Sequence, residues 1–264
     1  MTTPPRILIV AGSDSGGGAG LQADLKTVLA LGGYGTTAVT ALTAQNTLGV
    51  HEVLAVPEAF VRRQMRVVLD DLGADAVKTG MLKDAGIIAA VAEELPSGVP
   101  VVVDPVMIAK GGAALLDFQA IGALKQLLLP RTSVLTPNLP EAEALLGIDI
   151  ADLDGMKRAA QMLLQLGPAA VLLKGGHLPG ETVHDVLIDA AGIQVFSAPR
   201  IVSRHTHGTG CTLASALATG LGAGLSLTEA TVRARDYVRE AIRTAPGFGH
   251  GHGPLGHGHT VGRF

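Results

Sequence analysis

Short runs of apolar residues alternate with longer amphipathic segments along most of the chain. Runs rich in β-branched residues predict strands, and apolar residues at helical spacing predict the helices between them. The predicted strands cover residues 6–11, 36–43, 74–78, 101–104, 133–136 and 169–174, and the predicted helices include 19–31, 57–72, one from Thr212 onward and one over 228–243. This alternation is typical of a parallel sheet with helices on both faces, the α/β class.

Two strand-like segments near the end of the pattern follow each other without a helix between them. They cover residues 182–189 and 192–197, with Ala190-Ala191-Gly192 as the turn, and predict an antiparallel hairpin at a sheet edge. No linker or internal repeat divides the chain. Residues 1–264 are therefore predicted to form one domain with a His/Gly-rich C-terminal tail over 249–264.

Polar clusters with glycine or proline follow the predicted strands. They are Gly12-Ser13-Asp14, Gln45-Asn46, Thr79-Gly80-Met81, Asp104-Pro105, Thr136-Pro137-Asn138 and Lys174-Gly175-Gly176-His177. Open α/β sheets bind their ligands at the carboxyl ends of the strands. We therefore expect these clusters to converge on one binding rim.

The stretch 203–220 combines a glycine-containing loop with the start of a predicted helix. Gly208 and Gly210 flank Thr209, and such glycines allow several backbone N–H groups to point at one place. Because a helix N-terminus also carries unpaired donors and a positive dipole, the stretch predicts an anion site. Cys211 lies at its floor, where we expect the thiolate to be favoured. An ordinary loop leading into a buried helix is also compatible with this stretch.

The composition narrows the function classes. The chain has 47% hydrophobic residues, a net charge of −3, no Trp, two Tyr and five Phe. Few aromatic platforms and no basic run argue against nucleic acid as a partner. No apolar run reaches the length that a membrane span needs, and no signal peptide is recognisable. A single cysteine suits a reducing compartment, so we expect a cytoplasmic protein that does not bind membranes.

The glycine-rich segment 12–20 (GSDSGGGAG) does not match a known nucleotide loop well. It lacks the Gly-Lys-Ser/Thr ending of a Walker A loop, and Gln45 stands where a dinucleotide fingerprint needs an acid. A turn that brings the backbone close to a small ligand fits better. Asp24, one turn inside the next predicted helix, is expected to face this loop and contact the ligand.

Two further groups of residues are candidates for metal or phosphate contacts. Asn138 and Glu141 are spaced to order the water ligands of Mg²⁺, and the same spacing forms a helix capping box; the two roles can coexist. Lys174 at a strand end could neutralise a phosphate. The tail histidines could bind a transition metal, although glycine-spaced terminal histidines lack a scaffold. His205 and His207 near Cys211 raise the possibility of a Cys–His nucleophile, which suits the anion site poorly.

Several ordered motifs together resemble a known enzyme family. They are Ala19-Gly-Leu-Gln-Ala-Asp-Leu-Lys-Thr27, Ala44-Gln-Asn-Thr47, Thr79-Gly-Met-Leu82, Val103-Asp-Pro-Val-Met107, Thr136-Pro-Asn-Leu-Pro-Glu-Ala142, Leu173-Lys-Gly-Gly-His177, Thr206-His-Gly-Thr-Gly-Cys-Thr212 and Gly251-His-Gly-Pro-Leu255. This set resembles the hydroxymethylpyrimidine/phosphomethylpyrimidine kinases of thiamine biosynthesis, in the ribokinase-like superfamily. The similarity extends from about residue 7 to the end of the chain.

The resemblance implies a three-layer α/β/α fold and an ATP- and Mg²⁺-dependent kinase, usually a homodimer. Its substrate would be 4-amino-5-hydroxymethyl-2-methylpyrimidine and then the monophosphate of that alcohol. By motif match, Cys211 would be the catalytic base beside Gly208, Thr209 and Gly210. Other matched positions would bind the pyrimidine (Gln45, Asp24, Gly12, Met81, Val106), the nucleotide (Lys174, Asp104, Thr206) and, through water, Mg²⁺ (Asn138, Glu141).

Two alternatives remain open at this point. A pyridoxal kinase belongs to the same superfamily and phosphorylates a similar heteroaromatic alcohol, although Gln45 and Met81 favour the pyrimidine. A protein that binds metal through its His-rich tail would be of another class. The relative turnover of the two alcohols, and the activity of a chain without residues 249–264, distinguish these alternatives.

Overall fold

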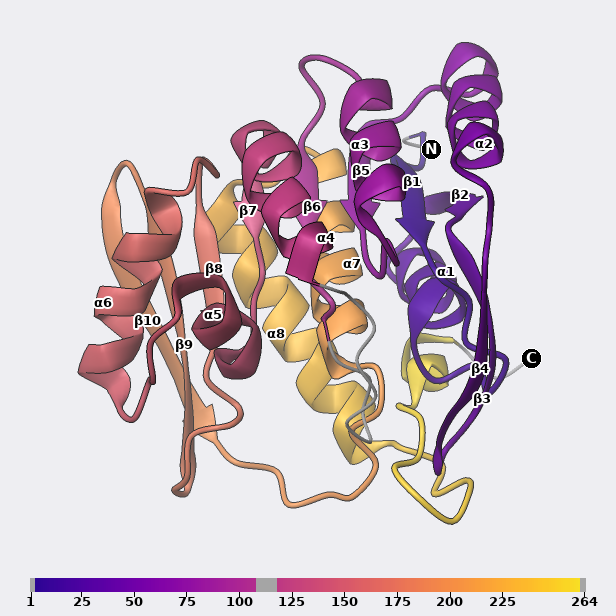
Figure 1. Ribbon diagram of the computed structural model, residues 1–264. Helices are drawn as coiled ribbons and strands as arrows, with labels where there is room; N and C mark the ends of the chain where they lie inside the picture. Colours follow the sequence, from indigo (N-terminus) through magenta and orange to yellow (C-terminus); the bar gives the residue numbers. More distant parts are fainter. Residues whose placement is uncertain (1–2, 108–117, 262–264) are drawn as a thin grey trace.

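A computed structural model describes residues 3–107 and 118–261. The strands are β1 Arg6–Ala11, β2 Tyr34–Val39, β3 Ala41–Asn46, β4 Gly49–Ala55, β5 Ala76–Thr79, β6 Val101–Val103, β7 Val134–Leu135, β8 Val171–Lys174, β9 Thr182–Asp189 and β10 Gly192–Pro199. The helices are α1 Gly20–Ala30, α2 Glu58–Asp71, α3 Ala85–Glu94, α4 Phe118–Ala123, α5 Leu139–Leu146, α6 Leu153–Leu164, α7 Thr209–Gly222 and α8 Leu227–Arg243. These elements form a sheet with helical cover (Figure 1).

The main sheet has eight strands in the order β10-β9-β8-β7-β6-β5-β1-β2. Pairing is parallel from β8 to β2, whereas β9 runs antiparallel to both β8 and β10. The expected antiparallel hairpin therefore stands at the sheet edge, and its strands match the predicted segments 182–189 and 192–197. The other strand and helix predictions agree within a few residues, with the exception of the segment 36–43.

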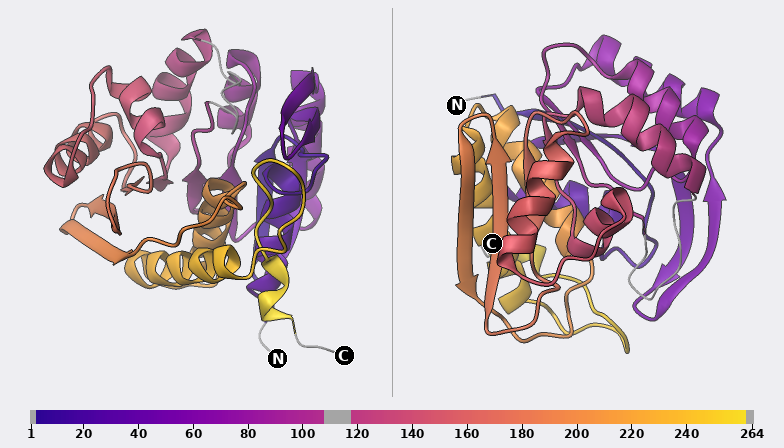
Figure 2. Two further views of the ribbon diagram at one scale, coloured as in Figure 1. Left: turned by 90° about the horizontal axis from the view of Figure 1, so that it is seen from below. Right: turned by 60° about the vertical axis from the view of Figure 1, so that its left-hand side comes forward.

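The segment 36–43 is divided between two sheets, so the prediction of one continuous strand there is wrong. The break is at Thr40, whose N–H donates to the Ala11 carbonyl at 3.0 Å and whose hydroxyl donates to the Met81 carbonyl at 2.6 Å. Beyond it, β3 pairs with β4 in a separate two-stranded sheet. Gln45 thus lies on this hairpin, which Figures 1 and 2 show at one end of the molecule, and not at a strand end of the main sheet.

Alternating side chains of the strands form two separate apolar cores. Leu8 and Val10 of β1 pack in the core under helices α2 to α6, whereas Ile7 and Ile9 pack in the core under α1, α7 and α8. Successive residues of a strand face opposite sides, so a fully apolar strand is covered on both faces. Figure 2 shows the two helical layers on either side of the sheet. The three-layer α/β/α prediction is confirmed.

The C-terminal segment packs onto the domain. The His252 N–H donates to the Thr47 carbonyl at the tip of the β3–β4 hairpin, and His207 forms an isolated β-bridge with Pro254. The segment ends in a 3₁₀ turn, His257–Thr260, and residues 262–264 of the predicted tail lie outside the described part. None of the helices described here combines the length and the hydropathy that crossing a bilayer requires. A cytoplasmic location stays a prediction.

Candidate active site

A cavity of about 330 Å³ opens where β1, β5, β6, β7 and β8 end. Its walls include nearly all of the predicted site residues: Gly12, Gln45, Met81, Asp104, Val106, Asn138, Glu141, Lys174, Thr206, Gly208, Thr209, Gly210 and Cys211. The predicted convergence of the polar clusters on one rim is confirmed. The volume is near the lower limit for small-molecule sites, which suits a single-ring ligand.

The start of α7 forms one wall of the cavity. Gly208 has a φ of 84°, a left-handed conformation that glycine adopts without strain, and a Cβ there would overlap the carbonyl oxygen of Gly18. Thr209, Gly210 and Cys211 make up the first turn of α7 and line the cavity, and the Thr209 N–H lies 3.5 Å from the Thr206 carbonyl. The positive end of the helix dipole therefore borders the cavity, and the anion site stays a prediction.

The thiol of Cys211 does not have the acidity expected from the sequence. Burial raises the pKa of Cys211 to about 12; the carboxylates of Asp24 and Asp104 act in the same direction, and the ammonium of Lys78 and a hydrogen bond from the Gly20 backbone act against it. The prediction of a favoured thiolate is wrong, because this environment favours the neutral thiol at pH 7.

Asp24 is buried below the cavity and does not line it, so the prediction that it contacts the ligand is wrong. Its carboxylate accepts from Lys78 Nζ at 2.8 Å and from the Ser215 hydroxyl at 2.7 Å, and both ionic side chains are 0% exposed. Burial alone would lower the pKa of Lys78, but Asp24, Cys211 and Asp104 hold it above its ordinary value. Lys78 therefore remains an ammonium at the cavity wall.

A second charged group in the cavity wall consists of Lys174, Asp104 and Glu141. Lys174 Nζ donates to Asp104 Oδ1 at 2.8 Å. Burial raises the pKa of Glu141 to about 7; Lys174 lowers it, and Asp104 raises it. Asn138 and Glu141 form the capping box that was recognised as possible, with Glu141 N–H donating to Asn138 Oδ1 at 2.9 Å and Asn138 N–H to Glu141 Oε2 at 2.8 Å.

This second group fits a hydrated Mg²⁺. Two buried carboxylates lie beside one lysine, and burial raises the pKa of Glu141 although Lys174 opposes the rise. Within residues 3–107 and 118–261, no three His, Cys, Asp or Glu side chains gather in a way that would hold a metal ion. A cation here would therefore keep most of its waters, which is the usual behaviour of Mg²⁺.

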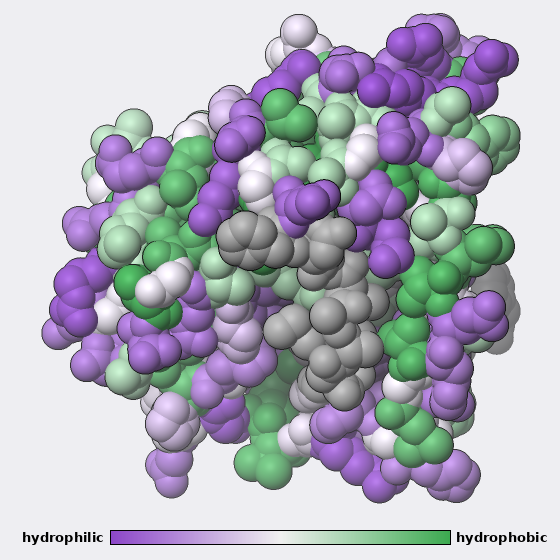
Figure 3. Space-filling model, in the orientation of Figure 1, coloured by the Kyte–Doolittle hydropathy of each residue, from purple (hydrophilic) through white to green (hydrophobic). Residues whose placement is uncertain are grey.

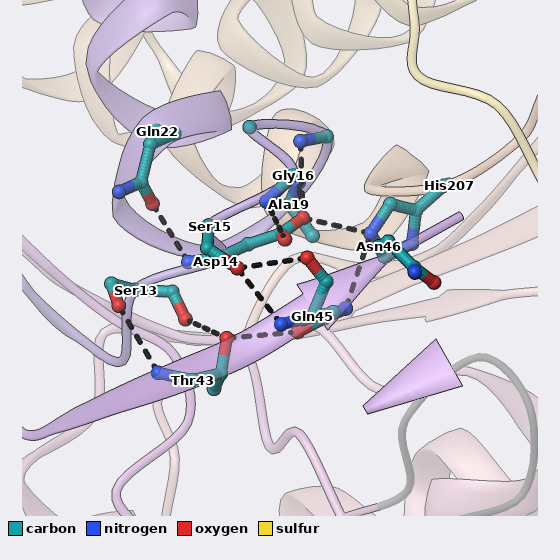
Figure 4. Close-up of polar contacts among 12 residues, drawn as sticks. Ser13, Asp14, Ser15, Gly16, Ala19, Gln22, Thr43, Gln45, Asn46 and His207 are labelled. Carbon is teal, nitrogen blue, oxygen red and sulfur yellow. Dashed lines mark hydrogen bonds and ion pairs between the residues drawn. The ribbon is translucent and has the colours of Figure 1, made fainter. Parts of the chain in front are cut away.

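The substrate side of the cavity is an interconnected polar network (Figure 4). His207 Nε2 lies 2.9 Å from Asp14 Oδ2 and 3.3 Å from the amide nitrogen of Gln45. The Thr43 hydroxyl joins Gln45 to the loop after β1, since it lies 3.3 Å from the Gln45 amide and 2.9 Å from the Ser13 carbonyl. Sequence reasoning gave Asp14 and Thr43 no individual role and considered His207 only as a partner of Cys211.

Some of the missed residues left a signal in the sequence. Lys78 interrupts an apolar strand run, which is unusual for a side chain that is almost never buried without a partner. The β3–β4 hairpin also has a turn signal, because Asn46 Oδ1 accepts from the N–H groups of Leu48 and Gly49. The pairing of Asp14 with His207 left no such signal, since the two are 193 residues apart.

The tail histidines do not form a metal centre in the part of the tail that the structure describes. His257 is 8% exposed and lies 3.1 Å from the Tyr237 hydroxyl. Burial, together with the nearby Lys26 and His259, lowers the pKa of His257 to about 4. The buried, neutral imidazole of His257 packs against Tyr237, so this histidine does not support the alternative of a protein that binds metal through its tail.

Comparisons with known proteins agree with this arrangement. The model of the family described as phosphomethylpyrimidine kinase matches residues 14–256. The chain is 50% identical over 261 residues to the hydroxymethylpyrimidine/phosphomethylpyrimidine kinase of Streptomyces coelicolor, covering 98% of this chain and 97% of that protein. It is 54% identical over 253 residues to the thiamine biosynthesis bifunctional protein ThiED of Geobacter sulfurreducens, covering 95% of this chain but only 52% of that longer protein.

Solved structures show the same fold. The pyridoxal kinase from Staphylococcus aureus in complex with ADP superposes with a TM-score of 0.91 at 34% identity, covering 97% of this chain and 94% of that one. The phosphomethylpyrimidine kinase from Clostridium difficile gives a TM-score of 0.80 at 43% identity, covering 90% and 99% respectively.

Proposed function

The chain belongs to the phosphomethylpyrimidine kinase family, and from this premise we propose that it phosphorylates 4-amino-5-hydroxymethyl-2-methylpyrimidine with ATP. The monophosphate of that alcohol is the proposed second substrate, which makes this a kinase of thiamine biosynthesis. One observation carries the proposal: the first turn of α7, Gln45 and Lys174 line the same cavity. A ring alcohol, a migrating phosphoryl group and a nucleotide phosphate thus have adjoining places.

The pyrimidine is proposed to lie between the loop after β1 and the β3–β4 hairpin. Gln45 offers one hydrogen-bond donor and one acceptor, which match the amino group and the ring nitrogen of an aminopyrimidine. Gly12, Met81 and Val106 supply a close backbone approach and apolar contact for the ring. The low volume of the cavity supports a ligand of this size.

The nucleotide phosphates are proposed to lie between α7 and the Lys174 group. Lys174 neutralises phosphate charge, and Thr206 and Asp104 border the same space. Asn138 and Glu141 are proposed to order the waters of Mg²⁺, which when bound would neutralise charge on the phosphates. The N-terminal turn of α7, from Gly208 to Cys211, is proposed to stabilise the negative charge that develops on the transferred group, because the positive end of the helix dipole borders the cavity.

Cys211 is proposed to lie against the reacting hydroxyl and to accept its proton as a thiolate. Because burial favours the neutral thiol, the thiol must first release its own proton to solvent, and only the ionised form, which the Lys78 ammonium stabilises, acts as the base. General-base help is typically worth about 10²–10⁴-fold in rate, so Cys211→Ala should lower kcat by that factor and leave the KM for ATP unchanged. The second phosphorylation needs this help less, because a phosphate monoester is already largely ionised near neutrality. Steady-state assays on the two substrates test both points: an equal loss on both would contradict the role of the base.

Pyridoxal is the second candidate substrate, because S. aureus pyridoxal kinase shares the fold at a TM-score of 0.91. Identity favours the pyrimidine, at 50% to the S. coelicolor kinase against 34% to the pyridoxal kinase. The deciding experiment measures kcat/KM for both alcohols with ATP and Mg²⁺. A higher value for pyridoxal would overturn the proposed substrate while leaving the kinase assignment intact.

A homodimer is proposed from the exposed apolar side chains of the β3–β4 hairpin. Leu42, Leu48 and Leu54 are 48%, 65% and 64% exposed, and Figure 3 shows apolar residues on the side of the molecule where Figure 1 places this hairpin. Contiguous exposed apolar residues are typical of protein interfaces. The mass of the protein in solution tests the proposal.

A further inference from the structure

Asp14 and His207 form a buried pair that the proposed chemistry does not use. They are 2% and 8% exposed, and both border the cavity. Besides His207, the Asp14 carboxylate accepts from the backbone N–H groups of Gly16, Gly18 and Ala19 at 2.8, 3.0 and 2.8 Å. Burial would raise the pKa of Asp14, but His207 and these amides hold it below its ordinary value. Asp14 is therefore an ionised acceptor at neutral pH.

Because Asp14 is ionised, its contact with His207 determines which nitrogen of the imidazole ring carries the hydrogen. An ionised carboxylate can only accept hydrogen bonds, so His207 Nε2, at 2.9 Å from Asp14 Oδ2, must carry a hydrogen. The nearer terminal atom of the Gln45 amide lies 3.3 Å from the same nitrogen. Two N–H groups cannot bond each other, so the favourable atom of Gln45 on this side is its oxygen.

Thr43 leads to the same conclusion from the other side of the amide. Its hydroxyl donates its one hydrogen to the Ser13 carbonyl at 2.9 Å, and it lies 3.3 Å from the second terminal atom of Gln45. The hydroxyl can therefore only accept there, which requires the amide nitrogen of Gln45. Amide oxygen and nitrogen are assigned from their hydrogen bonds, and both neighbours of Gln45 demand the same orientation (Figure 4).

The C-terminal segment contacts both His207 and the hairpin that carries Gln45. The backbone N–H of His207 donates to the Gly253 carbonyl at 3.2 Å. The Gly251 N–H lies 3.3 Å from the Thr47 hydroxyl at the tip of the hairpin that carries Gln45. Gly18 passes so close that a Cβ there would lie 2.5 Å from His207 Cδ2, so the imidazole has little freedom to rotate.

We propose that Asp14 and His207 are positioning residues that fix the orientation of the Gln45 amide and thereby set substrate specificity. The amide then presents its oxygen on the side of His207 and its nitrogen on the side of Thr43. This orientation leaves the second lone pair of the oxygen and the second N–H of the nitrogen for hydrogen bonds to a ligand. The ligand class is a heteroaromatic ring with an amino group next to a ring nitrogen, in one orientation only. This inference rests on the proposed function, because it assumes that Gln45 contacts the ring.

The experiment compares His207→Leu, which removes the donor, with His207→Gln, whose amide nitrogen can occupy the place of Nε2. We expect His207→Leu to raise the KM for the aminopyrimidine alcohol about tenfold, the equivalent of one hydrogen bond. The KM for ATP should not change, and kcat should stay within about threefold. His207→Gln should recover most of the loss. His51→Leu, which removes an exposed imidazole from β4, is the matched control.

A double-mutant cycle with Gln45→Ala decides whether the effect passes through Gln45. We expect His207→Leu to have no further effect on the KM for the alcohol once Gln45 is Ala. An undiminished tenfold effect in that background, or an equal rise in the KM for ATP, would overturn the inference. If Gln45→Ala alone leaves the KM for the alcohol unchanged, the substrate site of the proposed function is wrong, and the inference is refuted with it. Thermal unfolding of each variant confirms that the comparison is between folded proteins.

Discussion

The single cysteine gives a direct test of the electrostatics at the reacting centre, because any thiol label on this chain reports on Cys211 alone. The perturbation is alkylation of the protein with iodoacetamide, without added substrate, as a function of pH. Only the thiolate reacts. Since burial raises the pKa of Cys211 to about 12, the folded protein should be slow to label at neutral pH.

The size of the effect follows from two opposing terms. A rise from 9.0 to about 12 lowers the thiolate fraction below pH 9 about 1,000-fold. A more basic thiolate is also the better nucleophile, with a Brønsted slope of about 0.4–0.5, which recovers roughly 20- to 30-fold over this range. We therefore expect labelling about 50-fold slower than that of the same chain unfolded in urea. The folded rate should still increase at pH 10, where the unfolded chain levels off.

The competing expectation is that the N-terminus of α7 activates the thiol. Charge–dipole stabilisation there is worth about 0.3–1 kcal/mol and up to about 2 in partly buried sites, whereas a rise of three pKa units corresponds to about 4 kcal/mol. Desolvation therefore outweighs the dipole. A folded protein that labels as fast as the unfolded chain, with a midpoint at or below pH 9, would refute this reasoning.

The remaining predictions concern stability and assembly. The folded state favours the neutral imidazole of His257, so this side chain contributes fully to the free energy of unfolding above pH 6.5, and its contribution is lost as the pH falls towards 4. At pH 5 the protein should have lost about 2 kcal/mol of its free energy of unfolding for this reason. In denaturant titrations, His257→Gln should reduce the difference in unfolding free energy between pH 7.5 and pH 5 by that amount, whereas His250→Gln, at an exposed residue, should not; an equal pH dependence in both variants would contradict this prediction. In light scattering, the protein should have about twice its chain mass of 26.8 kDa, and Leu42→Ser with Leu54→Ser should give the monomer; an unchanged mass would exclude this face as the interface.

Periodicity predicted the main sheet well because most of its strands are buried on both faces and read as apolar runs. It could not predict the break at Thr40, since residues 36–43 contain no glycine, proline or other turn residue that would interrupt the strand pattern. The break is made by hydrogen bonds from Thr40 to Ala11 and Met81, which belong to other strands. Local pattern therefore located the elements, while the division between two sheets depended on contacts distant in sequence.

The candidate site shows the same limit. The position of Lys174 at the cavity followed from the strand pattern, because the ends of neighbouring parallel strands meet at one edge. Gln45 lines the same cavity from the separate β3–β4 hairpin, and Cys211 lines it from α7, so their places depend on contacts that the strand pattern does not show. Helical spacing could not tell where the Asp24 carboxylate points, since its partner Lys78 belongs to another element. Predicting the acidity of Cys211 required the burial around it, and the sequence shows only that a helix begins there.

The proposed roles in substrate recognition and in phosphoryl transfer fall on consecutive residues of the chain. The His207 side chain, which contacts Asp14, is proposed to orient the Gln45 amide, whereas Gly208 directly precedes the first turn of α7. Both pack against the same loop, because a Cβ on Gly18 would meet the His207 ring and a Cβ on Gly208 would overlap the Gly18 carbonyl oxygen. A change confined to the His207 side chain leaves the Gly208 backbone in place. Alteration of the loop itself would disturb recognition and chemistry together, so the separation of KM from kcat in the His207 variants tests how the site divides its two tasks.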